Sequence, residues 1–185
     1  MVSKTKTISS NTMTDKDLDK LFCMNAKKFK FSKLLLKSIA IVESSLDEHA
    51  YRYEKNFWDT YLKDNEEWKD KDPSKVSASW GLMQLMYTTA WELGFRGEPE
   101  ELENPVYNIE LGAKYLKSCL DNALSRIDWV KHDKHFSPLD AALAKYNGGR
   151  GKRPSENGVF SNQKYIDKVR RQWDLLLASE KDCDD

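Results

Sequence analysis

The chain has 185 residues, of which 39% are hydrophobic and 32% are charged. This length suits one domain with its own core better than two, and the composition is typical of a folded globular protein. The 30 basic residues balance the 30 acidic ones, so no overall field points to nucleic acid as a partner. We therefore expect a single domain that is monomeric and has no nucleic-acid partner.

The cysteines and histidines give no sign of a metal site. Cys23, Cys119 and Cys183 are far apart, and no histidine lies at metal-ligand spacing from them. Because their number is odd and no CxxC pair occurs, they argue against a disulfide framework. We expect no metal, no cofactor and synthesis in a reducing compartment.

The first residues contain no apolar segment of the kind that a secretory signal peptide needs. The longest apolar run, residues 34–42, is too short to cross a bilayer and is interrupted by Lys37. We expect no transmembrane segment and no export through a standard signal.

Hydrophobic spacing predicts the helices in chain order. Residues 1–14 lack periodicity and predict a flexible arm, whereas Leu35, Ile39 and Val42 form one helical stripe. The expected helices cover residues 31–45, 82–93, 108–124, 138–146 and 165–177. Residues 47–79 mix aromatic and charged side chains and predict a long excursion with a short helix, and residues 180–185 predict a frayed acidic tail.

No segment shows the alternation of polar and apolar residues, bounded by tight turns, that a β-sheet domain requires. The predicted fold class is therefore mainly α, with one domain over residues 15–179. The basic stretches at residues 27–37 and 150–171 are typical of solvated faces, although the second could also contact an anionic wall.

Glu43 follows the apolar run of the first predicted helix, in the string IVESS. An ionised carboxylate in apolar surroundings is costly unless it is paired or its pKa is raised. From this segment alone, a glutamate facing water is the favoured interpretation.

Four further blocks follow IVESS in a fixed order and change this interpretation. They are GLMQL at 81–85, NPVYNIELGAKYL at 104–116, ALAKYNGG at 142–149 and QKYIDKV at 163–169. Together the five blocks resemble those of the soluble lytic transglycosylases, over residues 34–169. Each block alone is a weak signal, but five in order are hard to obtain by chance.

The resemblance implies a lysozyme-like domain with a central substrate cleft that takes the glycan strands of peptidoglycan. It implies that Glu43 is the catalytic acid and base. It also implies substrate-binding residues, which are Ser79, Met83, Gln84, Tyr146, Asn147 and Tyr165. The implied reaction leaves a 1,6-anhydro product and requires no cofactor.

Structural roles compete for several of these residues. Met83 is of a type that more often fills a core, while Gln84 is polar inside an apolar pentapeptide and needs a specific partner. Tyr146 and Asn147 could simply end a helix before Gly148, and Ser79 could cap one. Ser44 either caps a helix or supports Glu43.

The chain departs from the family pattern between Glu43 and Gly81, where 38 positions form a longer segment containing HAYRYEKNFW. There either Arg52 and Glu54 form an ion pair, or Tyr51 and Tyr53 line the cleft. The family often has a glutamate four positions before Tyr165, where this chain has Ser161. The resemblance therefore implies no carboxylate at this position to support Glu43.

Two rival functions remain open. A hydrolase on the same fold would need a second carboxylate aimed at water, and the candidates in the excursion are Asp59, Asp64, Asp70 and Asp72. A non-catalytic wall-binding module would keep the fold without needing Glu43. Because no signal peptide is expected, a phage endolysin that is made in the host cytoplasm and reaches the wall after membrane breach is favoured over a periplasmic enzyme.

Overall fold

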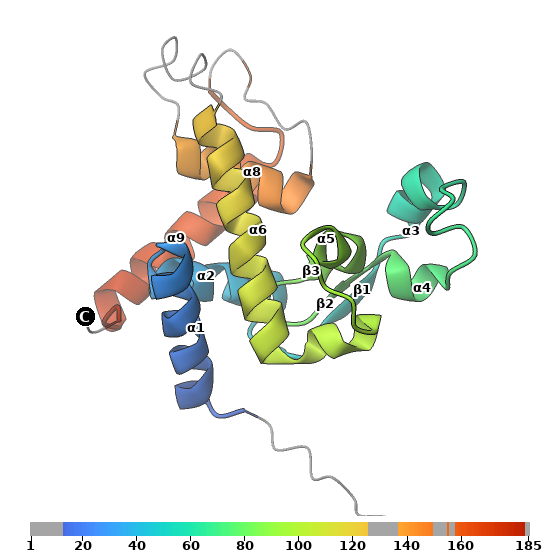
Figure 1. Ribbon diagram of the computed structural model, residues 1–185. Coiled ribbons are helices and arrows are strands. Elements are labelled where there is room, and N and C mark those ends of the chain that lie inside the picture. Colours follow the sequence, from blue (N-terminus) through green and yellow to red (C-terminus); the bar gives the residue numbers. More distant parts are fainter. Residues whose placement is uncertain (1–12, 126–136, 150–154, 156–157, 184–185) are drawn as a thin grey trace, which may run out of the picture.

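A long helix, α6 (Pro105–Ser125), runs through the centre of the molecule between two lobes (Figure 1). The structure is a computed structural model that describes residues 13–125, 137–149, 155 and 158–183. The predicted N-terminal arm therefore lies almost wholly outside the described residues. Helix α6 includes the whole of the helix predicted at 108–124, which is confirmed.

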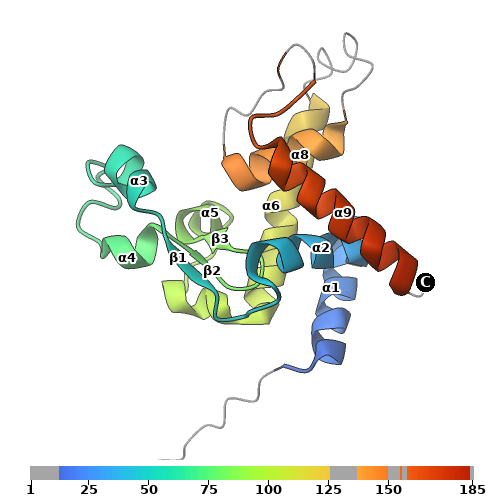
Figure 2. The ribbon, with the colours of Figure 1, turned by 180° about the vertical axis from the view of Figure 1, so that it is seen from behind.

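The larger lobe is helical and surrounds α6. Its other helices are α1 (Asp15–Phe29), α2 (Lys33–Ser44), α8 (Pro138–Gly148) and α9 (Gln163–Ser179). Helix α6 packs against α1 and α8, whereas α2 packs against α1 and α9 (Figures 1 and 2). Each helix gives a fully buried side chain to the shared core, for example Phe22, Ile39, Leu116, Leu143 and Ile166.

Helix α2 carries Glu43 and has well-defined ends. The Ser32 hydroxyl accepts hydrogen bonds from the first turn, including one from the Leu34 N–H at 3.1 Å. Ser45 ends the helix in the left-handed conformation, with φ 58°, and its N–H donates to the Ile41 carbonyl. The helix predicted at 31–45 is thus confirmed, with Glu43 in its last turn.

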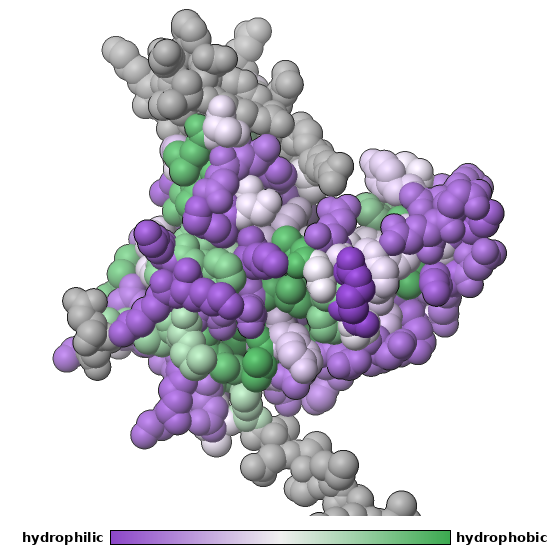
Figure 3. All heavy atoms as spheres, viewed as in Figure 1, coloured by the Kyte–Doolittle hydropathy of each residue, from purple (hydrophilic) through white to green (hydrophobic). Residues whose placement is uncertain are grey.

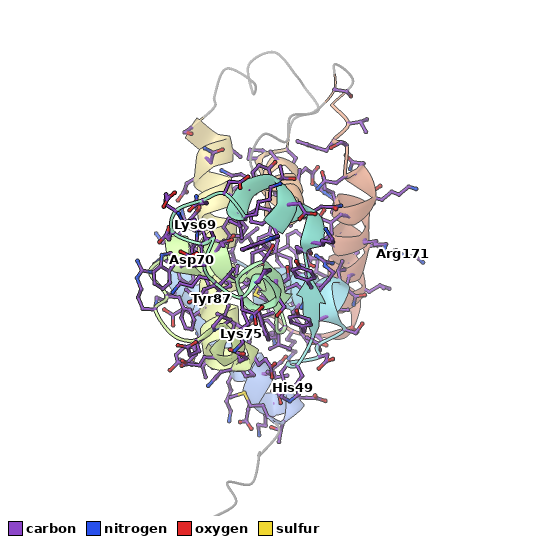
Figure 4. All side chains as sticks on the ribbon, turned by 90° about the vertical axis from the view of Figure 1, so that its right-hand side faces the viewer. His49, Lys69, Asp70, Lys75, Tyr87 and Arg171 are labelled. Carbon is purple, nitrogen blue, oxygen red and sulfur yellow. A yellow bond between two sulfur atoms is a disulfide. The ribbon has the colours of Figure 1, made fainter. Side chains whose placement is uncertain are left out.

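The smaller lobe contains a three-stranded antiparallel sheet that the sequence did not predict. The strands are β1 (Tyr51–Tyr53), β2 (Ala78–Trp80) and β3 (Leu85–Met86), in the order β1-β2-β3. Short helical segments complete the lobe, namely α3 (Lys55–Phe57), a π-helical turn (Trp58–Leu62), α4 (Pro73–Val76), α5 (Tyr87–Glu92) and a 3-10 turn (Pro99–Glu103). Trp68, Trp80 and Tyr87 contribute to a second core here, and Figure 4 shows Tyr87 inside this lobe.

The helix predicted at 82–93 is wrong in its first half. Only Tyr87–Glu92 is helical, because Gly81 and Gln84 both have positive φ, at 67° and 45°, and residues 85–86 pair with β2. The hydrophobic spacing of Leu82 and Leu85 reflects burial in a turn and a strand rather than one face of a helix.

Helix α1 is absent from the helices that the sequence predicted. Its N-cap is Thr14, whose hydroxyl accepts from the Asp17 N–H, and Lys30 ends it in the left-handed conformation. Only Leu18, Phe22, Asn25 and Ala26 are buried on this helix, so its apolar stripe is short.

The described part of the acidic tail is not frayed. The Glu180 carboxylate accepts a hydrogen bond from Lys37 Nζ on α2 at 2.8 Å. Asp182 Oδ1 accepts from the Lys33 N–H, at the start of the same helix, at 2.9 Å. Asp182 therefore accepts a hydrogen bond from a free N–H at the start of α2. Glu180 neutralises the charge of Lys37, which is largely buried.

A disulfide joins Cys23 of α1 to Cys183 of the tail. The odd cysteine count was misleading because the third residue, Cys119, is a buried free thiol in α6. Burial raises the pKa of the Cys119 thiol to about 11, which makes it unreactive. The argument from the cysteine count against a disulfide framework therefore missed one disulfide.

Reduction of this disulfide is expected to lower the free energy of unfolding by about 2 to 4 kcal/mol, because the bond closes a loop of most of the chain. Urea unfolding with and without reductant measures the difference. In Cys183→Ser, reductant should have no effect. An equal response of both proteins to reductant would show that the bond does not contribute.

The face in Figure 3 is mostly hydrophilic over the smaller lobe, with hydrophobic patches near α1 and α6. In the second basic stretch, Lys164, Lys168 and Arg171 are exposed, and Arg171 projects outward from α9 in Figure 4. Its first members, Arg150, Lys152 and Arg153, lie outside the described residues. Among the described helices, none is both long enough and apolar enough to cross a membrane.

Candidate active site

A cleft of about 820 Å³ lies between the two lobes, with Glu43 in its wall. From the larger lobe it is lined by Tyr115, Tyr146 and Asn147, and from the smaller lobe by residues of the sheet and of the excursion at 47–79. Of the predicted site residues, the cleft brings together Glu43, Ser79, Gln84, Tyr146 and Asn147.

Glu43 is a partly buried carboxyl. Desolvation in the cleft wall raises its pKa above the ordinary value for glutamate. The Tyr165 hydroxyl and the Arg52 guanidinium favour the ionised form and oppose this rise, whereas the negative charge of Glu54 adds to it. The net direction is upward, so Glu43 keeps its proton to higher pH than an exposed glutamate, as a general acid requires.

Two tyrosines, the buried Tyr146 and the partly buried Tyr165, lie beside Glu43. The Tyr146 hydroxyl donates to the Met83 carbonyl at 2.9 Å and so connects α8 to the 81–85 turn. The Tyr165 hydroxyl, on α9, is buried and makes no well-aligned hydrogen bond to a described residue. It nevertheless lies close enough to the Glu43 carboxyl to favour the ionised form of that group. Burial raises the pKa of both phenols, so they remain neutral donors. Tyr165 thus supports Glu43 from behind the cleft wall rather than lining the cleft.

The turn at 81–84 positions the opposite side of the site. Gln84 Nε2 donates to the carbonyls of Ala50 and Gly81, at 2.9 and 3.1 Å. This is the specific partner that the sequence predicted for Gln84. Gln84 also lines the cleft.

Asn108 holds this turn from below, a role that the sequence analysis missed. It is fully buried in α6, accepts from the Met83 N–H at 2.7 Å and donates to the Trp80 and Leu102 carbonyls, both at 2.8 Å. A Cβ at Gly81 would lie 2.6 Å from the Asn108 amide, so only glycine permits this approach. The only sequence signal for this role was that Asn108 belongs to the NPVYNIE block of the family resemblance.

The structure places the Met83 side chain in the core, the alternative to the substrate-binding role that the resemblance implies. Its side chain is fully buried in the main core and does not line the cleft. A Cβ at Gly112 would lie 2.5 Å from the Met83 sulfur, which explains the glycine in α6 as the residue that lets this side chain pack closely. Met83 contributes to the site through its backbone carbonyl and N–H.

Ser44 and Ser79 have different roles. The Ser44 hydroxyl donates to the Leu82 carbonyl at 2.8 Å and so fastens the end of α2 to the 81–85 turn. Ser79 is almost completely buried in β2 but lines the cleft, which places it away from a helix N-cap. Ser44 therefore supports Glu43 structurally, and Ser79 offers a hydroxyl to a ligand.

Asn147 lies at the C-terminal end of α8, where Gly149 follows with φ 70°. Its side-chain oxygen accepts from Asn162 Nδ2 at 3.1 Å. Asn162 also donates to the Ala144 carbonyl at 2.9 Å, so it connects the end of α8 to the start of α9. Asn147 therefore both ends α8 and lines the cleft.

The excursion gives charged residues to the cleft. Arg52 Nε donates to Glu54 Oε1 at 2.5 Å, and both side chains line the cleft with Glu43. The ion pair that the sequence offered as one alternative is therefore confirmed. Tyr51 and Tyr53 do not line the cleft, and Tyr51 packs against Trp80 instead.

None of the four aspartates considered as a second acid lines the cleft. Asp59 pairs with Lys55, and Asp72 caps α4 by accepting from the Ser74 N–H. Asp70 is exposed on the outer surface of the smaller lobe (Figure 4). Glu54 is a carboxylate that does line the cleft with Glu43. From the sequence it was considered only as the ion-pair partner of Arg52.

Aromatic residues form the far wall of the cleft in the smaller lobe. They are Phe57, Tyr61, Trp68 and Trp91. Trp91 is held in place by a hydrogen bond from its Nε1 to Glu67 at 2.7 Å. Such faces suit the apolar side of sugar rings. The cluster of aromatic residues at 47–79 was the sequence signal for this wall. It did not show which of these side chains line the cleft and which are buried in the core of the smaller lobe.

A helical lobe, a small antiparallel sheet and a glutamate in the cleft between them define a lysozyme-like fold, as the sequence predicted. The family model described as Transglycosylase SLT domain matches residues 20–168, which include every predicted site residue. The chain therefore belongs to this family, the lytic transglycosylases that act on peptidoglycan. Among the described residues, no group of acidic, histidine or cysteine side chains is placed to hold a metal ion.

Proposed function

We propose that this protein cleaves the bond between N-acetylmuramic acid and N-acetylglucosamine in peptidoglycan and leaves a 1,6-anhydro end, with Glu43 as its single catalytic residue. The observation that carries the proposal is a glutamate in the cleft wall whose burial raises its pKa. Such a group is protonated before the reaction and can be ionised during it.

In the first step Glu43 donates its proton to the oxygen that leaves C1 of N-acetylmuramic acid, and the C1–oxygen bond breaks. The acetamido group of the same sugar stabilises the positive charge that develops at C1. The Tyr165 hydroxyl and Arg52 stabilise the new Glu43 carboxylate, since both favour its ionised form. These two groups therefore lower the free-energy cost of forming the Glu43 carboxylate in the cleft wall.

In the second step the Glu43 carboxylate removes the proton of the C6 hydroxyl, and the C6 oxygen bonds to C1. Glu43 returns to its protonated state, and no water is consumed. We assign the sugar contacts to Ser79, the Gln84 carboxamide oxygen and Asn147, because these polar groups line the cleft with Glu43. Amides and hydroxyls suit the N-acetyl and hydroxyl groups of the substrate.

The mass of the products tests the reaction. Purified peptidoglycan is digested to completion and the disaccharide-peptide fragments are weighed. We expect fragments lighter by one water than those from a hydrolase, with no new reducing ends. Fragments that carry the extra water would instead identify a hydrolase, and Glu54 would then be the candidate second carboxylate. No release of fragments would favour the wall-binding module.

We also propose that the protein acts as a monomeric phage endolysin, made in the host cytoplasm and active on the wall only after the membrane is breached. Cells that produce the protein should lyse only when a membrane-permeabilising agent is added. Lysis without the agent contradicts this localisation, and a dimer mass in light scattering contradicts the monomer.

A further inference from the structure

Strand β1 brings two charged residues to the same cleft wall as Ser79. In the antiparallel pairing with β2, Arg52 lies directly opposite Ser79. Opposed residues of an antiparallel pair point to the same face of the sheet, and both residues line the cleft. Glu54, two positions after Arg52, lines it as well.

The backbone of Glu54 is fixed, whereas the Arg52 side chain is mostly in solvent. The Glu54 N–H donates to the Ser77 carbonyl at 2.8 Å, and the Ser77 hydroxyl donates back to the Glu54 carbonyl at 2.9 Å. Ser77 is fully buried, while 60% of the Arg52 side chain is exposed. Glu54 is thus an anchored partner for a long cationic side chain.

The Arg52 guanidinium has a competing partner in the same cleft. Its charge already favours the ionised form of Glu43. A direct ion pair between them would keep Glu43 deprotonated and remove the acid. Tyr146 from α8 and Tyr165 from α9 face Glu43 as neutral groups. Lys145 of α8 is a further cation that lines the cleft.

We propose that Glu54 is a positioning residue that holds the Arg52 guanidinium away from Glu43, so that Glu43 stays protonated until the substrate is bound. This inference rests on the proposed function only for the acid role of Glu43. It differs from a second catalytic carboxylate, because Glu54 acts through Arg52 and does not touch the reacting atoms.

The test is a double-mutant cycle of Glu54→Gln, Arg52→Gln and the double variant, each compared with the wild type. In Glu54→Gln the basic limb of the pH–rate profile should shift to lower pH by about one unit, because Arg52 is released toward Glu43 and the negative charge of Glu54, which itself raises the Glu43 pKa, is lost. In Arg52→Gln this limb should shift to higher pH. In the Arg52→Gln background, the Glu54 substitution should have a much smaller effect.

Titration of ¹³C-labelled glutamate carboxyls by NMR gives a second readout that needs no substrate, with the Glu43 signal assigned by its loss in Glu43→Gln. The matched control is Asp59→Asn, which removes an exposed ion pair of the same lobe that does not line the cleft. If Glu54→Gln leaves the Glu43 titration where Asp59→Asn leaves it, the proposal is overturned. If the substitution acts equally with and without Arg52, the route through Arg52 is overturned. Both results are independent of whether the protein cleaves peptidoglycan.

Discussion

Glu43→Gln is expected to lower the rate of peptidoglycan cleavage by about a thousandfold or more, since one residue supplies both proton transfers. Glutamine keeps the size of the side chain and its position in the last turn of α2 but cannot give up a proton. The rate is measured by the clearing of a cell-wall suspension. A variant that clears the suspension as fast as the wild type would contradict the catalytic role.

The same substitution should not harm the fold, and its effect on stability depends on pH. The folded-state pKa of Glu43 is raised, so its favourable contribution is complete below the unfolded-state pKa of about 4.3 and is lost as pH rises through the folded-state pKa. Glutamine does not ionise. Glu43→Gln should therefore unfold at a higher temperature than the wild type at about pH 7, but not at about pH 4. Loss of activity together with loss of stability would instead indicate misfolding.

Asn108→Ala is expected to lower the free energy of unfolding by about 4 kcal/mol, because it leaves three buried backbone groups without a partner. These groups belong to Met83, Trp80 and Leu102, on either side of Gly81. The 81–85 turn should lose its fixed position, so activity should fall even at temperatures where the protein is still folded. Urea unfolding measures the stability.

The matched control is Asn122→Ala on the same helix, where the asparagine is only partly buried. Its free energy of unfolding should stay within about 0.5 kcal/mol of the wild-type value. Equal stability of the two variants would show that Asn108 does not hold the turn.

The described helices of the larger lobe other than α1 were predictable because their apolar stripes are local features of the sequence. Residues 31–45 and 108–124 are the best examples. The position of Glu43 in the last turn of α2 followed from the same periodicity. Its neighbours Gln84, Tyr146 and Asn147 came from the resemblance, because their approach to Glu43 depends on the tertiary fold.

The smaller lobe was not predictable by the same reasoning. Strands of two or three residues, such as β2 and β3, contain too few positions for an alternation to be visible. The pairing of Cys23 with Cys183 spans 160 positions and leaves no local signal. Asn108 looks like any polar residue of a helix, and only its three buried partners reveal its role.

The tail contacts of α2 have a consequence for the order of folding. Lys37 and Lys33 on this helix bind Glu180 and Asp182, which follow them by 143 and 149 positions. Contacts between such distant positions form slowly, because a long loop must close before they contribute. The helix that presents Glu43 therefore gains its last supports only after residue 182 has been made. We infer that a nascent or partly folded molecule does not yet hold Glu43 in its working position.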